Sequence, residues 1–148
     1  MKDIHLCLER VLHQIRANDE TLHKTYALVQ DPKIFIPLLE KIKSAFLELI
    51  EILLKHKGEK KGTVDANVVK FFAIIAPSYG LSPTYAKSLE EINTIFELHK
   101  TSKTEFSRHG SLVLCTEEFK IVVIEPKSIQ NYINLSKHFY TAVEKIVL

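Results

Sequence analysis

The sequence predicts a mainly α-helical bundle of five to six helices, with one small β-hairpin before the C-terminal helix. Three observations indicate this fold class. Residues 37–57 repeat apolar side chains at three- and four-residue steps around most of a helical circumference, which is typical of a helix covered on several sides. Other stretches show the same period on one face only. Residues 111–125 differ, because they form two short runs rich in β-branched residues.

The composition is that of a folded protein. A chain of 148 residues, 46% of them hydrophobic, fits one domain over residues 1–148 that needs no metal or disulfide to form a core. The net charge of +2 is too small to indicate a nucleic-acid partner. Of the 20 cationic residues 17 are lysine, which suits a solvated surface better than bidentate phosphate recognition. The charges within residues 37–57 argue against a membrane span.

The two cysteines, Cys7 and Cys115, are expected to be free, buried thiols in a reducing compartment. The first 14 residues are amphipathic and carry acidic side chains early, unlike a secretion signal. These features favour a cytoplasmic location.

The first helix is expected from about Lys2 to Ala17, with a kink or a cap at Asn18-Asp19 and a further segment to about Gln30. The pattern leaves open whether these are one helix or two. Asp31 and Pro32 then have the residue types of an N-cap and a first helical position. Pro37 either kinks this new helix or begins the central one.

Residues 58–62 contain no apolar side chain and are expected to form a surface loop. Thr63 is expected to cap a helix through Ala76, although the composition of VVKFFAII also allows a strand. Its expected inward residues are Val68, Val69, Phe72, Ile75 and Ala76. Ser82-Pro83 is a start signal for the next helix, which continues to about Lys100.

Residues 101–111 are polar, and we expect them to be irregular, with Phe106 buried among charged neighbours. The hairpin follows, with strands at 111–115 and 119–125 joined by a turn that lacks glycine. Pro126 opens the last helix, which extends to about Val147. Its expected buried row is Ile129, Tyr132, Ile133, Ser136, Phe139, Val143 and Ile146.

Several classes of site are excluded by what the sequence lacks. The four glycines have neither phosphate-loop nor dinucleotide-fold spacing, and no nucleophile-elbow serine is present. His5 and Cys7 diverge on a helix and cannot share a metal ion. We therefore expect no cofactor and no metal site.

One pair of residues, Arg16 and His23, has a spacing that occurs in a known catalytic pattern. Metal-independent ribonucleases of the HEPN type pair an arginine and a histidine that are separated by about four to six residues, and six residues separate Arg16 from His23. A histidine of near-neutral pKa can move the proton of a 2′-hydroxyl, and an arginine can stabilise the phosphorane. The alternative interpretation is two exposed helix residues at a chance spacing.

Two further polar groups are candidate binding residues. Lys55, Lys57, Lys60 and Lys61 form the densest cationic cluster, which suits either a phosphate backbone or a solvated loop. Arg108 and His109 lie in the most unusual polar stretch, residues 105–110. In one interpretation, Glu105 and Arg108 brace the hairpin against the preceding helix. In the other, Arg108 and His109 are the polar lining of a groove that Tyr79 and Tyr85 share, and they are alternative catalytic candidates.

Residues 98–133, LHKTSKTEFSRHGSLVLCTEEFKIVVIEPKSIQNYI, resemble uncharacterised archaeal proteins that are loosely HEPN-like helical bundles. The resemblance implies a bundle that often dimerises. The arginine–histidine signature is missing at the matching end, because Arg108 and His109 are adjacent and His138 stands far beyond.

The preferred interpretation is therefore a non-catalytic interaction or regulatory module that forms a homodimer. Two features favour the dimer: the central helix is apolar on more than one side, and a lone hairpin leaves an exposed edge. The competing hypothesis is an RNA-binding or RNA-cleaving protein.

Overall fold

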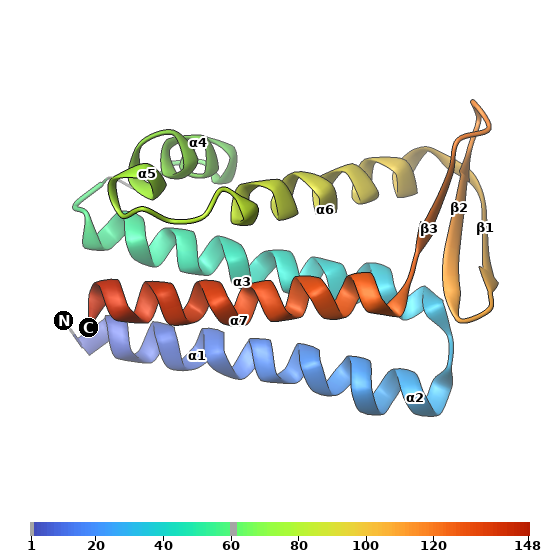
Figure 1. The fold of residues 1–148 in the computed structure, drawn as a ribbon, viewed down its shortest axis with the longest axis horizontal. Helices are drawn as coiled ribbons and strands as arrows, with labels where there is room; N and C mark the ends of the chain where they lie inside the picture. The colour runs from blue at the N-terminus through green and yellow to red at the C-terminus, as the bar shows by residue number, and fades with distance from the viewer. Residues whose placement is uncertain (1, 60–61) are drawn as a thin grey trace.

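The computed structural model describes residues 2–59 and 62–148 and confirms the predicted fold class, a mainly helical bundle with a small antiparallel sheet before the C-terminal helix (Figure 1). The elements in chain order are α1 (Lys2–Glu20), the π-helical turn η1 (Thr21–Thr25), α2 (Tyr26–Val29), the 3-10 turn η2 (Pro32–Ile34), α3 (Phe35–His56), α4 (Val64–Lys70), the π-helical turn η3 (Phe71–Ile75), α5 (Ala76–Ser78), α6 (Thr84–Thr101), β1 (Ser102–Arg108), β2 (Ser111–Thr116), β3 (Ile121–Ile124) and α7 (Pro126–Val147).

The central helix α3 is covered on most sides by other parts of the same chain. It packs against α1, α7, α4 and α6. Its Phe46 stacks on Phe139 of α7, with ring centroids 5.7 Å apart, and Tyr85 of α6 stacks on the same Phe139 ring at 4.6 Å. The apolar circumference of α3 is therefore explained within the chain. The apolar surface of α3 therefore no longer argues for a dimer.

The predicted helix start at Asp31 and Pro32 is confirmed, whereas the predicted break at Asn18-Asp19 is not. The Asp31 side chain accepts a hydrogen bond from the Lys33 N–H, and Pro32 occupies the first position of η2. Asn18 and Asp19, in contrast, lie inside α1 and do not cap a helix. Residues 2–29 form one helical stretch that passes through the π-helical turn η1, which answers the question of one helix or two.

The stretch from Thr63 to Ala76 is helical, as favoured, and Thr63 accepts the capping hydrogen bond from Ala66 N–H. Its inward face differs from the expected one. Val69 is 68% exposed, whereas Phe71 is fully buried. A single-sided helix buries one narrow stripe, here Val68, Phe71, Phe72 and Ile75, and Val69 falls just outside it.

The sheet is an antiparallel meander with strand order β1-β2-β3, so the expected hairpin has a third strand. The prediction of irregular structure for residues 101–111 was wrong. β1 is polar in sequence and pairs with β2 along its length, with a bulge between Ser102 and Thr104. The two strands are joined by His109 and Gly110, whose φ angles of 51° and 77° suit a tight hairpin turn.

One face of the sheet closes the end of the bundle. Leu112 and Leu114 of β2 and Ile124 of β3 belong to the main hydrophobic core. The β1–β2 turn is tied to α2, because the Tyr26 hydroxyl donates a 2.6 Å hydrogen bond to the Gly110 carbonyl oxygen. Figure 1 shows the strands standing across the ends of α3, α6 and α7. Of the helices in the described residues, none is long and apolar enough to cross a membrane.

Replacing Tyr26 with Phe is expected to lower the free energy of unfolding by about 1 kcal/mol, because it leaves the Gly110 carbonyl without its donor. Chemical denaturation measures this change. Tyr79→Phe is the matched control, since the Tyr79 hydroxyl makes no hydrogen bond with the described residues and its loss should leave the stability within about 0.5 kcal/mol. Equal effects of the two variants would contradict the role given to Tyr26.

Candidate interaction surface

The face of the sheet that points away from the helices is the most unusual surface of the molecule. Successive residues of a strand alternate between faces, and the register aligns Phe106 with Val113 and Val113 with Val123. Because Leu112 and Leu114 point into the core, these three side chains point outward. We call the outward residues the outer sheet face. They are Thr104, Phe106 and Arg108 on β1, Ser111, Val113 and Cys115 on β2, and Ile121, Val123 and Glu125 on and just after β3.

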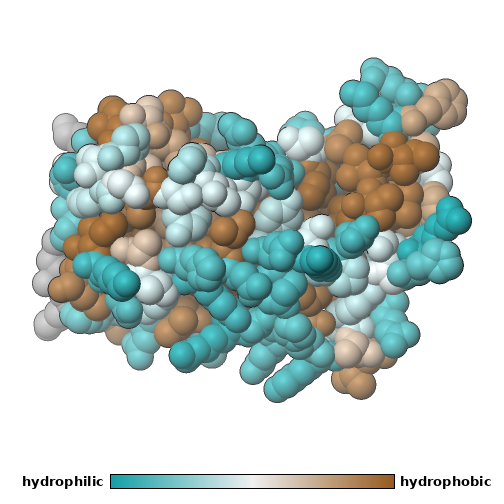
Figure 2. Space-filling model, in the orientation of Figure 1, coloured by the Kyte–Doolittle hydropathy of each residue, from teal (hydrophilic) through white to brown (hydrophobic). Residues whose placement is uncertain are grey.

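The centre of the outer sheet face is apolar and open. Ile121 is 68% exposed, Val123 49% and Phe106 42%. Figure 2 shows a hydrophobic area over the sheet end of the molecule, next to hydrophilic side chains. An antiparallel sheet with one solvated face normally alternates apolar and polar residues, but β3 reads Ile-Val-Val-Ile. Contiguous exposed apolar area of this kind marks interaction sites.

The prediction that Phe106 is buried was wrong, and the reason is its register. Phe106 lies opposite Val113 on the outer side of an edge strand, so no helix covers its ring. The neighbouring Glu105 has the opposite orientation. Its carboxylate contacts the ring nitrogen of His99 on α6 and accepts a hydrogen bond from Ser102. Glu105 therefore braces the sheet against the preceding helix, as one interpretation expected, whereas Arg108 remains exposed on the outer sheet face.

The charged residues of the outer sheet face, Arg108 and Glu125, lie at one end of it. Arg108 pairs in register with Ser111, and Glu125 follows Ile124, the partner of Leu112. Glu125 keeps extended backbone angles, φ −98° and ψ 152°, so the alternation of faces continues through it. Arg108, Ser111 and Glu125 therefore form one row across the sheet, with the positive charge at one edge and the negative charge at the other.

A single aromatic residue protrudes from the β2–β3 turn. Phe119 is 86% exposed, and its φ of 62° lies in the left-handed region. Its N–H donates to the Thr116 carbonyl oxygen, and Thr116 N–H in turn bonds to the carbonyl of Lys120, which is the pattern of a three-residue turn. Glycine or asparagine is favoured at such a position, and a bulky side chain there costs about 1 kcal/mol. The fold itself gains little from this side chain.

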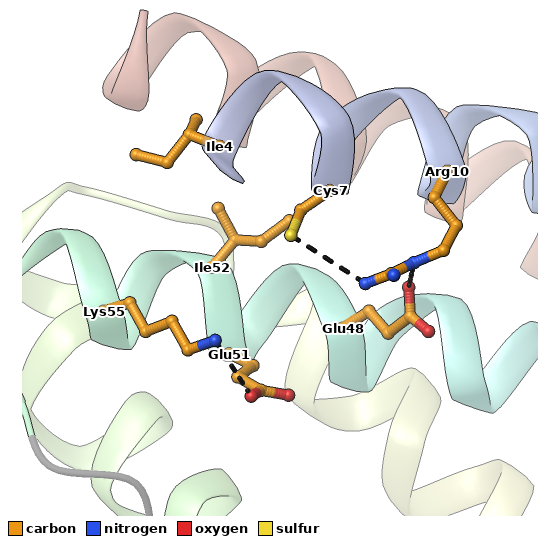
Figure 3. Close-up of a pocket in the computed structure, with 7 residues that line it drawn as sticks. All are labelled: Ile4, Cys7, Arg10, Glu48, Glu51, Ile52 and Lys55. Carbon is orange, nitrogen blue, oxygen red and sulfur yellow. Dashed lines mark hydrogen bonds and ion pairs between the residues drawn. The ribbon is translucent and has the colours of Figure 1, made fainter. Parts of the chain in front are cut away.

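A groove between α1 and α3 is a second candidate site. It has a cavity volume of about 140 Å³, with Ile4, Cys7 and Ile52 as its apolar part (Figure 3). Arg10 crosses the opening, where it donates to the Cys7 sulfur at 3.8 Å and lies 3.7 Å from Glu48. The polar side chains at its rim thus bind one another.

Cys7 and Cys115 are both free, as expected, but both are half-buried and not buried.

The proposed catalytic pair Arg16 and His23 is not brought together by any contact within the described residues. His23 instead lies 3.3 Å from Asp19, and Asp19 also accepts a 2.7 Å hydrogen bond from Lys137 of α7. Arg16 acts on Tyr140 of α7, where its charge partly offsets the effects of burial and of Glu144 that raise the pKa of that phenol.

The other predicted binding residues are dispersed. Lys55 pairs with Glu51 at 3.4 Å, and the Lys57 ammonium lies over the Tyr79 ring, 5.2 Å from its centroid. Lys60 and Lys61 lie outside the described residues. Arg108 and His109 sit at the sheet, while Tyr79 and Tyr85 lie at the opposite end of α6, so the shared groove predicted for these four residues does not form (Figure 1).

The described residues contain no group of three or more His, Cys, Asp or Glu side chains that would hold a metal ion. No protein family, curated protein or solved structure matches the chain. The outer sheet face was not found from the sequence, because its residues come from a strand expected to be irregular and from alternating positions of two others.

Asp19→Asn is expected to destabilise the protein by about 1 kcal/mol at neutral pH. Burial alone would raise the pKa of Asp19, but the hydrogen bond and charge of Lys137, with Gln130 and His23, outweigh it and hold this pKa below its ordinary value. The contribution of Asp19 is therefore present above about pH 4 and is lost as the pH falls through its folded-state pKa.

Urea denaturation between about pH 2.5 and 7 checks this prediction. The wild-type and Asp19→Asn curves should converge at the acidic end, whereas Glu20→Gln, which changes the neighbouring exposed carboxylate, should shift stability little at any pH. A difference between wild type and Asp19→Asn that stays constant over the range would rule out the lowered pKa.

Proposed function

We propose that this protein is a non-catalytic interaction module that forms a homodimer through the outer sheet face. The single observation that carries the proposal is the apolar centre of that face, in which Phe106, Ile121 and Val123 remain exposed around the buried Val113. Burial of apolar surface is favourable by about 25 cal/mol per Å², and these exposed side chains do not contribute that free energy in the isolated chain. A partner that covers them recovers it.

The outer sheet face suits a protein partner better than a small ligand. It is one face of a three-stranded antiparallel sheet, whereas small molecules are typically bound in concave pockets. It also has the composition of an interface core, with an aromatic and β-branched centre and charged residues at its border. The helices cover only the opposite face, so contact with a partner leaves the bundle intact.

The charged residues of the outer sheet face favour a second copy of the chain as the partner. Arg108 and Glu125 stand at opposite edges of one row, so the surface carries its own complementary charge. A two-fold interface brings the same patch of both subunits together and requires such self-complementarity. The expected dimer thus rests on the sheet and no longer on α3.

Ile121→Lys is expected to weaken self-association at least tenfold, because it places a charge in the apolar part of the contact, next to Val123. Sedimentation equilibrium or light scattering from about 1 to 100 µM protein measures the effect. Ile74→Lys is the matched control, since Ile74 is 59% exposed on η3, away from the sheet. A wild-type protein that stays monomeric throughout this range would overturn the proposal.

A second candidate function, metal-independent RNA binding or cleavage, draws support from the contact of His23 with Asp19, since a carboxylate can orient a histidine for proton transfer. Incubation with structured and single-stranded RNA in the presence of chelator tests it. Cleavage that is lost in His23→Ala and Arg16→Ala would favour this function. An RNA that remains intact, and unbound at low salt, would remove it.

A further inference from the structure

The outer sheet face is a small grid whose symmetry limits how two copies can meet. Two of its rows, Thr104–Cys115–Ile121 and Phe106–Val113–Val123, cross β1, β2 and β3 in that order. The third row is the pair Arg108–Ser111, which the extended residue Glu125 continues just after β3. Neighbouring strands lie about 4.8 Å apart, so Arg108 and Glu125 are about 10 Å from each other at the backbone. Two such grids can stack with their faces about 10 Å apart.

We infer that the two copies stack outer face to outer face about a two-fold axis parallel to β2, and that Arg108 of each copy pairs with Glu125 of the other. This inference rests on the proposed function, and it names the residues that select the partner. A rotation of 180° about that axis keeps each row at the same position along the strands and exchanges the β1 edge of the sheet with the β3 edge. β1 then covers β3 of the second copy, and β2 covers its own equivalent.

The charges favour this axis over the other face-to-face arrangement. With the axis parallel to β2, each guanidinium meets a carboxylate, and the pair occurs twice at the border of the contact. With the axis across the strands, the rows are inverted, and Glu125 lies over the apolar Ile121 of the second copy. A carboxylate opposed to an isoleucine loses water without gaining a partner, which costs free energy.

Side-chain size favours the same axis. The large Phe106 ring is at one edge of the middle row and the smaller Val123 is at the other edge. Exchange of the edges places each phenyl ring against a valine, with Val113 against Val113 in the centre, so the gap between the sheets is even. Inversion of the rows would instead oppose the two phenyl rings on one side and two valines on the other, which leaves a wedge.

The Arg108–Glu125 pairs give the contact its specificity. A different apolar sheet surface would match the centre of the grid, but only a surface with the same charged row would place opposite charges at both borders. The apolar middle row thus supplies most of the attraction, and the charged row determines which surface, and which orientation, is accepted.

Charge reversal tests this arrangement. Arg108→Glu and Glu125→Arg each place like charges together twice in their own homodimer, so each variant alone should associate at least tenfold more weakly than wild type. A mixture of the two variants should form a heterodimer, because the reversed residue of one copy then meets an unchanged opposite charge in the other. The doubly substituted chain, Arg108→Glu with Glu125→Arg, should regain self-association.

Matched controls keep the result interpretable. Arg16→Glu reverses an exposed arginine on α1 and should leave association unchanged. Circular dichroism of each variant shows whether it is folded, since Glu125 precedes the first turn of α7. Association of the mixture that is no stronger than that of either variant alone would overturn the inference.

Crosslinking of Cys115 gives an independent measurement. In the inferred dimer Cys115 faces Cys115 of the second copy, within reach of a short bismaleimide of about 8 Å, in a Cys7→Ser background. If the copies instead joined edge to edge through β3, three strand spacings would separate these residues by about 14 Å, and the short reagent would fail. A dimer that resists both charge reversal and crosslinking would refute this arrangement alone, whereas a monomeric wild type would refute the proposed function.

Discussion

The burial of α3 is the constraint on which the rest of the structure depends. Its side chains are apolar in nearly every direction, so a stable fold must supply neighbours on several sides. α1 and α7 cover one part of it, and α4 and α6 cover another. Phe139 of α7 joins these layers, because its ring contacts Phe46 of α3, Phe71 of η3 and Tyr85 of α6. Stacked and tilted ring pairs of this kind add to the energy of burial.

The position of the sheet follows from the same constraint. The helices cover the sides of α3, and the inner residues of β2 and β3 close the bundle at the start of α3. A sheet of three strands has two faces, and the bundle uses only one of them. The second face would be expected to carry polar residues if the chain acted alone. Packing within the bundle does not explain the exposed Phe106, Ile121 and Val123 on this face.

The helices were largely predictable from the sequence, because apolar period, N-cap residues and prolines agree along most of the chain. The Asp31 and Thr63 caps are direct examples. β1 was not predictable, because an edge strand needs only one neighbour and its polar residues give no apolar pattern. Its one informative signal was the short His109-Gly110 turn, since both residue types accept positive φ.

The candidate surface was harder to predict than the fold, because its residues become neighbours only through strand register. Cys115, Val123 and Phe106 are unremarkable in sequence, and Phe106 was assigned to the core. The Asp19 cluster shows the same difficulty, since its Lys137 is 118 residues away. Sequence spacing reveals which side chains share a helix face, but not which elements meet.

The turn that carries Phe119 has a consequence for protein engineering. Procedures that optimise each turn for the isolated chain would place glycine there, because glycine accepts the left-handed backbone without strain. The resulting protein would resist heat better and would lack the one aromatic ring that projects furthest into solvent from the sheet end of the molecule. At residue 119, the substitution that relieves the left-handed backbone therefore also removes an exposed aromatic side chain.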